Sequence, residues 1–426
     1  MATEDARYRQ TSQYQLWSFS PAQLAAMRET TNAAARARIA ERLSYSQPPS
    51  TAASSANTPD PSGGGSTPAP TPQLPEFLTP AEEAQLVAFF TSELLRAGDH
   101  AEMSDEIKAT AAVFFRRFYV TNSIMTYPPQ DMLIVALFFG CKAEGSFVSI
   151  SEFGRTFGKE HPEEILAGEF LLCQGLRFSL EVKHPFRALR GAIMELATLP
   201  DIDPARLGAA EARAREILRF SPLITDAYFH FTPSQIMLAA LSLADRGLAE
   251  RFITKTFHYV AAENSSGPAT PNPDSGAGTP APGPVKKGRA GEGNKADIIG
   301  SQVRDKVLGA VEACREMLAR EPPERREHWT NKAVIKAQIT PLKKKLKACR
   351  DPDRWNLVEL QRRRREQAAR RVDSDDEDAP TAGKKGSLES DAAVFGEPLS
   401  TGALASKRRK VEGKGGGGDP FGPPLV

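Results

Sequence analysis

The side chains that most often carry catalysis occur in this chain, but their spacing fits no catalytic arrangement. The four cysteines, Cys141, Cys173, Cys314 and Cys349, are widely scattered and no pair has Cys-x-x-Cys spacing, so neither a zinc site nor a disulfide framework is indicated. No histidine pair has His-Glu-x-x-His spacing, and no serine lies in a Gly-x-Ser-x-Gly turn. The chain lacks the Gly-x-Gly-x-x-Gly-x-Val, His-Arg-Asp and Asp-Phe-Gly motifs with which kinases hold ATP and magnesium. We therefore expect no catalytic residue, no metal ion and no cofactor.

Two charged residues stand inside otherwise apolar helical segments. Lys142 directly follows the apolar run Met132–Cys141, and Glu169 interrupts the apolar stripe of the segment 162–178. A lysine at the C-terminal end of a helix is favoured by the helix dipole. On the residues alone, the simplest interpretation is an ion pair within the chain or two solvated charges, which contribute under ~1 kcal/mol when exposed.

The elements that position these residues are indicated by a repeated pattern. Pro-x-Gln-x-Met-Leu occurs at 128–133 and again at 233–238, and an apolar run follows each copy. Proline suits the start of a helix, because its φ is preset and the first-turn N–H has no intrahelical partner. Two helices that begin alike about 100 residues apart predict a duplicated all-helical domain of ordinary size.

Composition limits the folded part of the 426 residues, because the 33 prolines and 32 glycines are concentrated in a few stretches. The segments 46–73 and 263–294 are rich in Pro, Gly, Ser and Thr, and we expect a disordered linker and a disordered insertion. The tail 372–426 has few large apolar residues and alternating charge blocks, and is also expected to be disordered. The net charge of +2 favours no class of partner. A polar N-terminus and the short run Met132–Cys141 argue against a secretory signal and a membrane span, which predicts a soluble intracellular protein.

Apolar residues recur at helical spacing through the remaining segments, and no stretch alternates with a period of two, so a sheet is not expected. Ser20, Thr79 and Ser104 are placed as N-caps, and Pro21 and Pro80 follow two of them. The predicted helices are 20–43, two that begin at Thr79 and Ser104, 128–142, 149–157, 162–178, 184–198, 204–231, 233–246, 248–259, and two that begin near Ile299 and Thr340.

The segment Arg116–Met125 (RRFYVTNSIM), followed by Tyr127 and Pro128, resembles the first cyclin box of the cyclin H family. In that family R-F-Y-x-x-N-S-[IV]-M-x-Y-x-P leads through an apolar helix to C-K-x-D/E. The segment Gly140–Glu144 (GCKAE) is similar to that ending.

Two further segments resemble the same family in the right order. Leu223–Tyr228 (LITDAY) with Phe231–Ile236 (FTPSQI) is similar to its second box, and Trp17–Arg28 is similar to its N-terminal part. The resemblance covers roughly 12–45, 75–262 and, more loosely, 295–350. It implies an all-α fold of two tandem five-helix cyclin boxes with extra N- and C-terminal helices. The predicted organisation is an N-terminal segment 1–45, the linker 46–73, a first box 74–180, a second box 181–320 that contains the insertion 263–294, basic C-terminal helices 321–371 and the tail 372–426.

The resemblance also implies which residues bind a kinase. Cyclins grip the kinase with a lysine at the end of the third helix and a glutamate on the fifth, and these match Lys142 and Glu169. Phe139, Phe178 and Leu180 occupy positions where cyclins present apolar contacts to the regulatory helix of the kinase. For Phe139 and Phe178, ordinary core packing is an equally weighted alternative.

One position departs from the family pattern. Cyclins commonly carry two adjacent acidic residues after the lysine, whereas here Glu144 is followed by Gly145. The loop contacts that the second carboxylate makes in cyclins are therefore not expected in this chain.

Taken as a whole, the resemblance implies a regulatory subunit and not an enzyme. Its partners would be a cyclin-dependent kinase catalytic subunit, a RING-containing assembly factor and the transcription and repair factor TFIIH, together forming the CDK-activating kinase. The substrates of the complex would be kinase activation loops and the C-terminal repeats of RNA polymerase II. Neither membrane association nor direct nucleic-acid binding is expected. A nuclear location is predicted from a basic run in the tail that resembles a nuclear localisation signal: Lys407, Arg408, Arg409 and Lys410.

The alternative from another class is a cyclin-fold transcription factor of the TFIIB type, which would use the basic runs Lys343–Lys347 and Arg362–Arg365 on DNA phosphates. Such a factor is expected to carry an N-terminal zinc ribbon, but no cysteine precedes Cys141. A plain helical scaffold is a third and weaker alternative.

Overall fold

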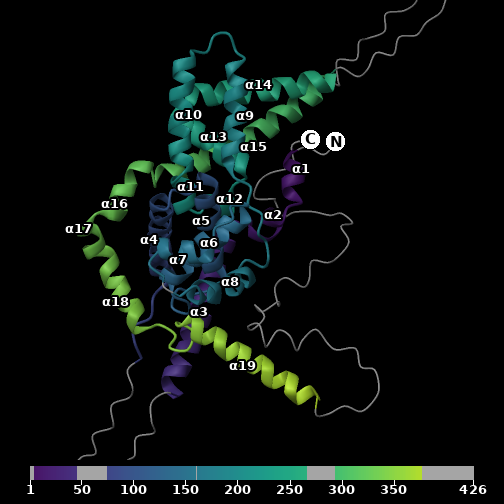
Figure 1. The fold of residues 1–426 in the computed structure, drawn as a ribbon. Coiled ribbons are helices and arrows are strands. Elements are labelled where there is room, and N and C mark those ends of the chain that lie inside the picture. Colours follow the sequence, from purple (N-terminus) through teal and green to yellow (C-terminus); the bar gives the residue numbers. More distant parts are fainter. Residues whose placement is uncertain (1–3, 46–73, 160, 266–292, 377–426) are drawn as a thin grey trace, which may run out of the picture. The chain divides into compact units, whose positions relative to one another are not determined.

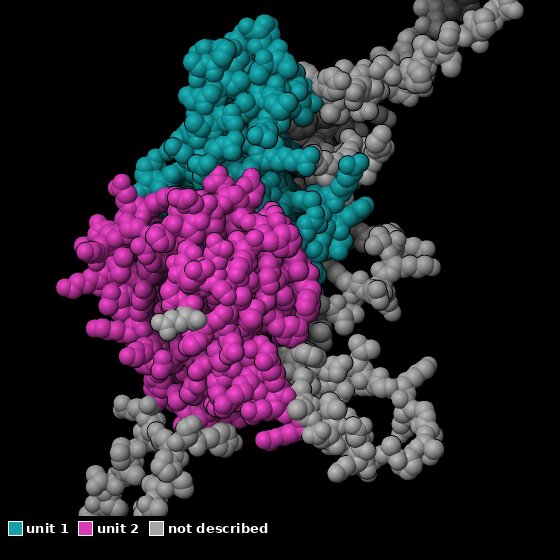
Figure 2. All heavy atoms as spheres, in the orientation of Figure 1, with its two compact units in different colours: residues 1–20, 181–325, 416–426 teal, residues 21–180, 326–415 magenta. Residues whose placement is uncertain are grey.

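The computed structural model describes residues 4–45, 74–159, 161–265 and 293–376, and within these ranges every regular element is helical (Figure 1). The predicted all-α class is therefore confirmed. The chain divides into two compact units (Figure 2). Unit 1 takes its described residues from Met1–Ser20 and Glu181–Arg325, and unit 2 from Pro21–Leu180 and Arg326–Gly415. None of the described helices combines the length and the apolar character needed to cross a bilayer.

Unit 2 is built around the helix Asp105–Thr121, which is buried on nearly every side. Its neighbours in the unit are four further helices, and the C-terminal helices pack on this group from outside. Local capping explains where these helices begin: Thr79 forms a capping box with Glu82, and the Ser104 hydroxyl accepts a hydrogen bond from the N–H of Ile107 at 3.3 Å. The helices of unit 2 are α3 (Pro21–Tyr45), α4 (Pro80–His100), α5 (Asp105–Thr121), α6 (Pro129–Ala143), α7 (Ile150–Thr156), α8 (Glu163–Gly175), α16 (Arg326–Thr330), α17 (Lys332–Val334), a π-helical turn (Ile335–Ile339), α18 (Thr340–Ala348) and α19 (Leu357–Asp376).

Unit 1 is centred on the second copy of the repeated pattern, the helix that begins at Pro233. Thr232 and Gln235 form its capping box, as in the helix that follows Thr79. The N-terminal residues join this unit, because the N–H of Phe19 donates to the carbonyl of Phe229 at 2.8 Å. The helices of unit 1 are α1 (Glu4–Arg9), α2 (Ser12–Trp17), α9 (Pro185–Ala197), α10 (Pro204–Leu218), α11 (Ser221–Ile224), α12 (Ala227–His230), α13 (Pro233–Ala244), α14 (Arg246–Ser265), α15 (Gly293–Ala319) and a short 3-10 turn (Pro323–Arg325).

Two predicted helices differ from the structure. The predicted helix 204–231 is three helices, α10, α11 and α12, because Pro222 lacks the N–H that a continuing helix needs and Thr225 is extended, with φ −86° and ψ 177°. The predicted helix 162–178 ends at Gly175, for a reason given below.

The predicted disordered segments fall mostly outside the described residues. The linker 46–73, residues 266–292 of the insertion and residues 377–426 of the tail are not described. Their described edges are helical: α14 continues to Ser265, α15 begins at Gly293 and α19 continues to Asp376.

Candidate functional site

Lys142 and Glu169 meet between α6 and α8, which pack against each other in unit 2. The Lys142 ammonium donates a hydrogen bond to the Glu169 carboxylate and forms an ion pair with it. The Lys142 nitrogen also lies 4.7 Å from the centroid of the Phe138 ring. The two side chains remain 42% and 19% exposed, so both are within reach of a partner.

The end of α6 explains why glycine follows Glu144. Gly145 has φ +72°, its N–H donates to the carbonyl of Lys142 at 3.2 Å, and the N–H of Ser146 donates to the carbonyl of Cys141 at 2.8 Å. These bonds form a Schellman motif, whose left-handed position favours glycine. The motif satisfies the last carbonyls of α6 and holds the backbone of Lys142 in place.

The chain after α8 contains two residues in the left-handed conformation that are not glycine. Arg177 has φ 52° and Phe178 has φ 55°. The helix is again closed by a Schellman motif, with the N–H of Phe178 donating to the carbonyl of Cys173 at 3.0 Å. Each such residue costs about 1–2 kcal/mol. Backbone strain of this kind often marks a functional position, because surrounding structure must maintain it.

Gly175 and Arg117 show how the surrounding structure fixes this turn. A Cβ atom at Gly175 would lie 2.4 Å from Cδ2 of the buried Phe118, so α8 approaches α5 more closely than any other residue type would allow. The Arg117 guanidinium, on α5, is 1% exposed and donates to the carbonyl of Ser179 at 3.4 Å. This contact holds the chain directly after Phe178.

Large apolar side chains are exposed along the chain that follows Lys142 and contains Glu169. We define the apolar surface as six residues that lie between positions 147 and 180 and are each at least 36% exposed. Within it the ring centroids of Phe170 and Phe178 are 6.4 Å apart, and the two rings meet edge to face. Exposed apolar side chains that contact one another, as these two rings do, are typical of interaction sites on protein surfaces. The apolar surface consists of Phe147, Val148, Leu166, Phe170, Phe178 and Leu180.

The structure separates the predicted contact residues into two groups. Phe178 is 63% exposed and Leu180 is 36% exposed, whereas Phe139 is 9% exposed and its ring centroid lies 5.8 Å from that of Phe114. Phe139 is therefore packed in the core of unit 2, which is the alternative that the sequence left open.

Sequence reasoning missed four members of the apolar surface: Phe147, Val148, Leu166 and Phe170. One signal was present for two of them. The helix α8 buries Ile165 and Leu172 on its inner face, yet it also carries Leu166 and Phe170, one turn apart. A helix that is apolar on more than one face has more apolar surface than a single core contact requires.

The chemistry available at this site is binding chemistry. Burial, with a smaller contribution from the Glu169 charge, raises the pKa of the nearby Cys173 thiol, which keeps it protonated at neutral pH. No cluster of three or more His, Cys, Asp or Glu side chains in the described part of the chain is arranged to hold a metal ion. Lys142 supplies hydrogen-bond donors and Glu169 supplies acceptors. The predicted localisation residues Lys407–Lys410 lie outside the described residues.

Comparisons with known proteins agree with this architecture. The family described as "Cyclin C-terminal domain" matches residues 184–319. Cyclin CCL1 of Saccharomyces cerevisiae is 30% identical over 258 residues, which cover 60% of this chain and 62% of that protein. Cyclin-H of Xenopus laevis is 33% identical over 191 residues, which cover 41% of this chain and 57% of that protein. The chain thus matches less than two thirds of the length of these two relatives.

A solved structure gives a longer match. A chain of the CAK complex of Chaetomium thermophilum bound to ATP-γ-S is 65% identical, with a TM-score of 0.71, and the match covers 90% of this chain and 100% of that one. This identity extends over nearly the whole chain, and it agrees with the helical units and with the matches to named cyclins. The chain belongs to the cyclin H family.

Proposed function

We propose that this chain is the regulatory cyclin subunit of a cyclin-dependent kinase and acts in the CDK-activating kinase module of TFIIH. The observation that carries the proposal is the exposed Lys142–Glu169 pair, whose glutamate lies on α8 next to Phe170 of the apolar surface. The 65% identity to a chain of the CAK complex of Chaetomium thermophilum supports the assignment to this kinase module. The chain itself would not be catalytic, because its sequence contains none of the motifs with which kinases position ATP.

The proposed mechanism is a shift in the conformational population of the kinase. A subunit that binds the active conformer better than the inactive one raises the populated fraction of the active conformer. Phe170, Phe178 and Leu180 would pack against the regulatory helix of the kinase, in the manner of a helix laid on an apolar face. Lys142 and Glu169 would exchange part of their contact with each other for hydrogen bonds to a backbone loop of the kinase. The charged pair then fixes the register, and the apolar contacts provide most of the affinity.

The remaining partners follow from the same family assignment. A RING-containing assembly factor and the TFIIH core would complete the complex, whose substrates would be kinase activation loops and the C-terminal repeats of RNA polymerase II. Nuclear import would depend on Lys407, Arg408, Arg409 and Lys410. Replacing these four residues with alanine should move a fluorescent fusion of the chain out of the nucleus.

A reconstitution assay tests the central claim. The kinase that co-purifies with the tagged chain is prepared alone, and phosphate transfer from radiolabelled ATP is measured for the chain, the kinase and the mixture. We expect no transfer by the chain alone and a large rise in the mixture. Phe178→Ser should reduce this rise, whereas Met194→Ser, which removes a 66% exposed apolar side chain from unit 1, should not. Equal rates for the kinase with and without this chain would contradict the proposal.

A further inference from the structure

The C-terminal part of unit 2 contains a continuous basic rod. The helix α17, the π-helical turn and α18 follow one another without a break from Lys332 to Ala348 (Figure 1). Between Glu327 and Asp351 the chain carries seven lysines and arginines and no acidic residue. At 1.5 Å per residue, 17 residues span about 25 Å.

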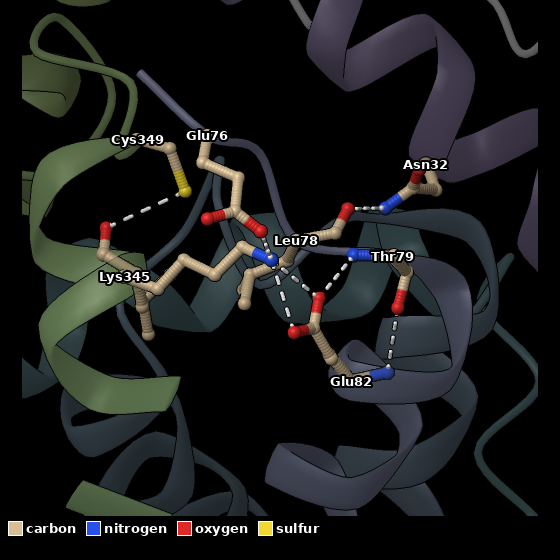
Figure 3. A network of polar contacts seen from close by, with 8 residues as sticks. Asn32, Glu76, Leu78, Thr79, Glu82, Lys345 and Cys349 are labelled. Carbon is tan, nitrogen blue, oxygen red and sulfur yellow. Dashed lines mark hydrogen bonds and ion pairs between the residues drawn. The ribbon is translucent and has the colours of Figure 1, made fainter. Parts of the chain in front are cut away.

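Two of these lysines hold the rod against the rest of unit 2. The Lys345 ammonium donates to Oε1 of Glu76 at 2.6 Å and to both carboxylate oxygens of Glu82 at 2.9 and 3.0 Å (Figure 3). The Lys343 nitrogen lies 4.2 Å from the centroid of the Phe89 ring on α4. Partial burial lowers the pKa of Lys343. Both lysines are therefore structural.

Four other lysines on the rod are directed to solvent. Lys332, Lys336, Lys344 and Lys347 are exposed, and within the described residues none of them forms a hydrogen bond or an ion pair. We call these four residues the basic face.

The π-helical turn aligns the basic face. In this turn the N–H of Thr340 donates to the carbonyl of Ile335, five residues earlier, so the turn holds one more residue than an α-helical turn. At 3.6 residues per turn, the four lysines would spread over about 120° in an unbroken α-helix, and one additional residue in the turn reduces this spread to about 80°.

The composition of the basic face indicates what it binds. An acidic peptide would need apolar anchors for stable docking, but no large apolar side chain between Arg326 and Arg350 is among the exposed ones. Trp329, the one aromatic ring here besides His328, is 7% exposed, so no indole surface is offered for base stacking. Lysines act as hydrated point charges, which suit phosphates without selecting a sequence.

We propose that the basic face binds the phosphate backbone of double-stranded nucleic acid without reading its sequence. A rod of about 25 Å extends along about seven base pairs of duplex. This contact uses none of the residues of the kinase-binding surface proposed above. It goes beyond the sequence-based expectation, in which direct nucleic-acid binding was not anticipated.

The salt dependence of binding provides a quantitative test. If the basic face neutralises four phosphates, the logarithm of the association constant should fall with the logarithm of salt concentration with a slope of about −3.6. This slope corresponds to an affinity about 150-fold lower at 200 mM salt than at 50 mM. The test variant replaces Lys332, Lys336, Lys344 and Lys347 with glutamine, which keeps the helix propensity and removes the charge. We expect it to bind a fluorescent 20-base-pair duplex at least tenfold more weakly at 50 mM KCl, with a slope about 3–4 units shallower.

A matched control removes the same charge elsewhere in the full-length chain. Arg187, Arg190, Lys306 and Arg320 are exposed in unit 1, and their side chains form no ion pair within the described residues. Glutamine at these four positions should leave duplex affinity within threefold of wild type. If the test variant folds poorly by circular dichroism, the double variant K344Q/K347Q should still reduce the slope by about 2.

Several results would overturn the proposal. These are an absence of duplex binding by the wild-type chain at 50 mM KCl, an unchanged slope in the test variant, or equal losses in the test and control variants. Competition by poly-glutamate as effective as competition by unlabelled duplex of equal charge would assign the basic face to an acidic protein partner.

Discussion

Replacing Lys142 with alanine distinguishes a structural ion pair from a binding contact. In the free chain the Lys142–Glu169 pair is partly solvated, with side chains 42% and 19% exposed. Exposed pairs contribute under about 1 kcal/mol to the free energy of unfolding. The Lys142→Ala variant should therefore melt within about 3 °C of wild type.

The effect on kinase binding should be much larger. In the complex this lysine would be buried and bonded to backbone of the kinase, and removal of one partner from such a contact costs about 2–5 kcal/mol. At 1.4 kcal/mol per factor of ten, the dissociation constant should rise by about 30-fold to 4,000-fold. Most of this change should appear in the dissociation rate.

Surface plasmon resonance with immobilised kinase, together with calorimetric melting, measures both quantities on the same preparations. The matched control is Arg206→Ala in unit 1, which removes a bidentate pair with Asp245 whose side chains are 54% and 18% exposed. It should alter stability by a similar small amount and leave kinase affinity unchanged.

A charge swap makes the test sharper. The double variant Lys142→Glu with Glu169→Lys restores an ion pair within the chain but reverses the groups presented to the kinase, so we expect its affinity to stay low. An affinity for Lys142→Ala within threefold of wild type, or full recovery in the swapped variant, would refute the reasoning.

Three further predictions concern stability. Glu102 is exposed and occupies the left-handed position after α4, with φ 52°. Glu102→Gly should therefore raise the free energy of unfolding, measured by urea denaturation, by about 1 kcal/mol; a lower free energy of unfolding would contradict the strain argument. Gly175→Ala places a methyl group 2.4 Å from a ring carbon of Phe118 and should lower that free energy by about 1–3 kcal/mol, which a normal denaturation midpoint would disprove. Burial raises the pKa of Glu83 above 4.5, so the native state holds the proton more tightly than the unfolded state. The contribution of this carboxyl to the free energy of unfolding is therefore lost as the pH rises from about 4.5 through the raised pKa. Glu83→Gln removes this titration, so the stability of the variant relative to wild type should increase over that window and then stay constant; a difference independent of pH would contradict the assigned cause.

The first residues of several helices could be predicted from the sequence. Thr79 and Ser104 were recognisable as N-caps, because an N-cap side chain bonds to an N–H group two or three residues along the same chain. The helix that begins at Pro233 was recognisable from the proline of the repeated pattern. The resemblance to the cyclin H family, and not local physical chemistry, singled out Lys142 and Glu169 as candidate contact residues. The all-α class followed from periodicity, which is also a property of neighbouring residues.

Only tertiary structure decided where α8 ends and which apolar side chains remain exposed. The predicted helix 162–178 stops at Gly175, where α8 meets Phe118 of α5, and two strained residues follow. Phe139 and Phe178 were equivalent candidates by residue type, yet the first packs on Phe114 and the second is exposed. Burial depends on neighbours that are distant along the chain, and no local pattern encodes how closely two helices approach. The ion pair between α6 and α8 and the anchoring of the basic rod depend on the same packing, since each joins residues that lie 27 or more positions apart.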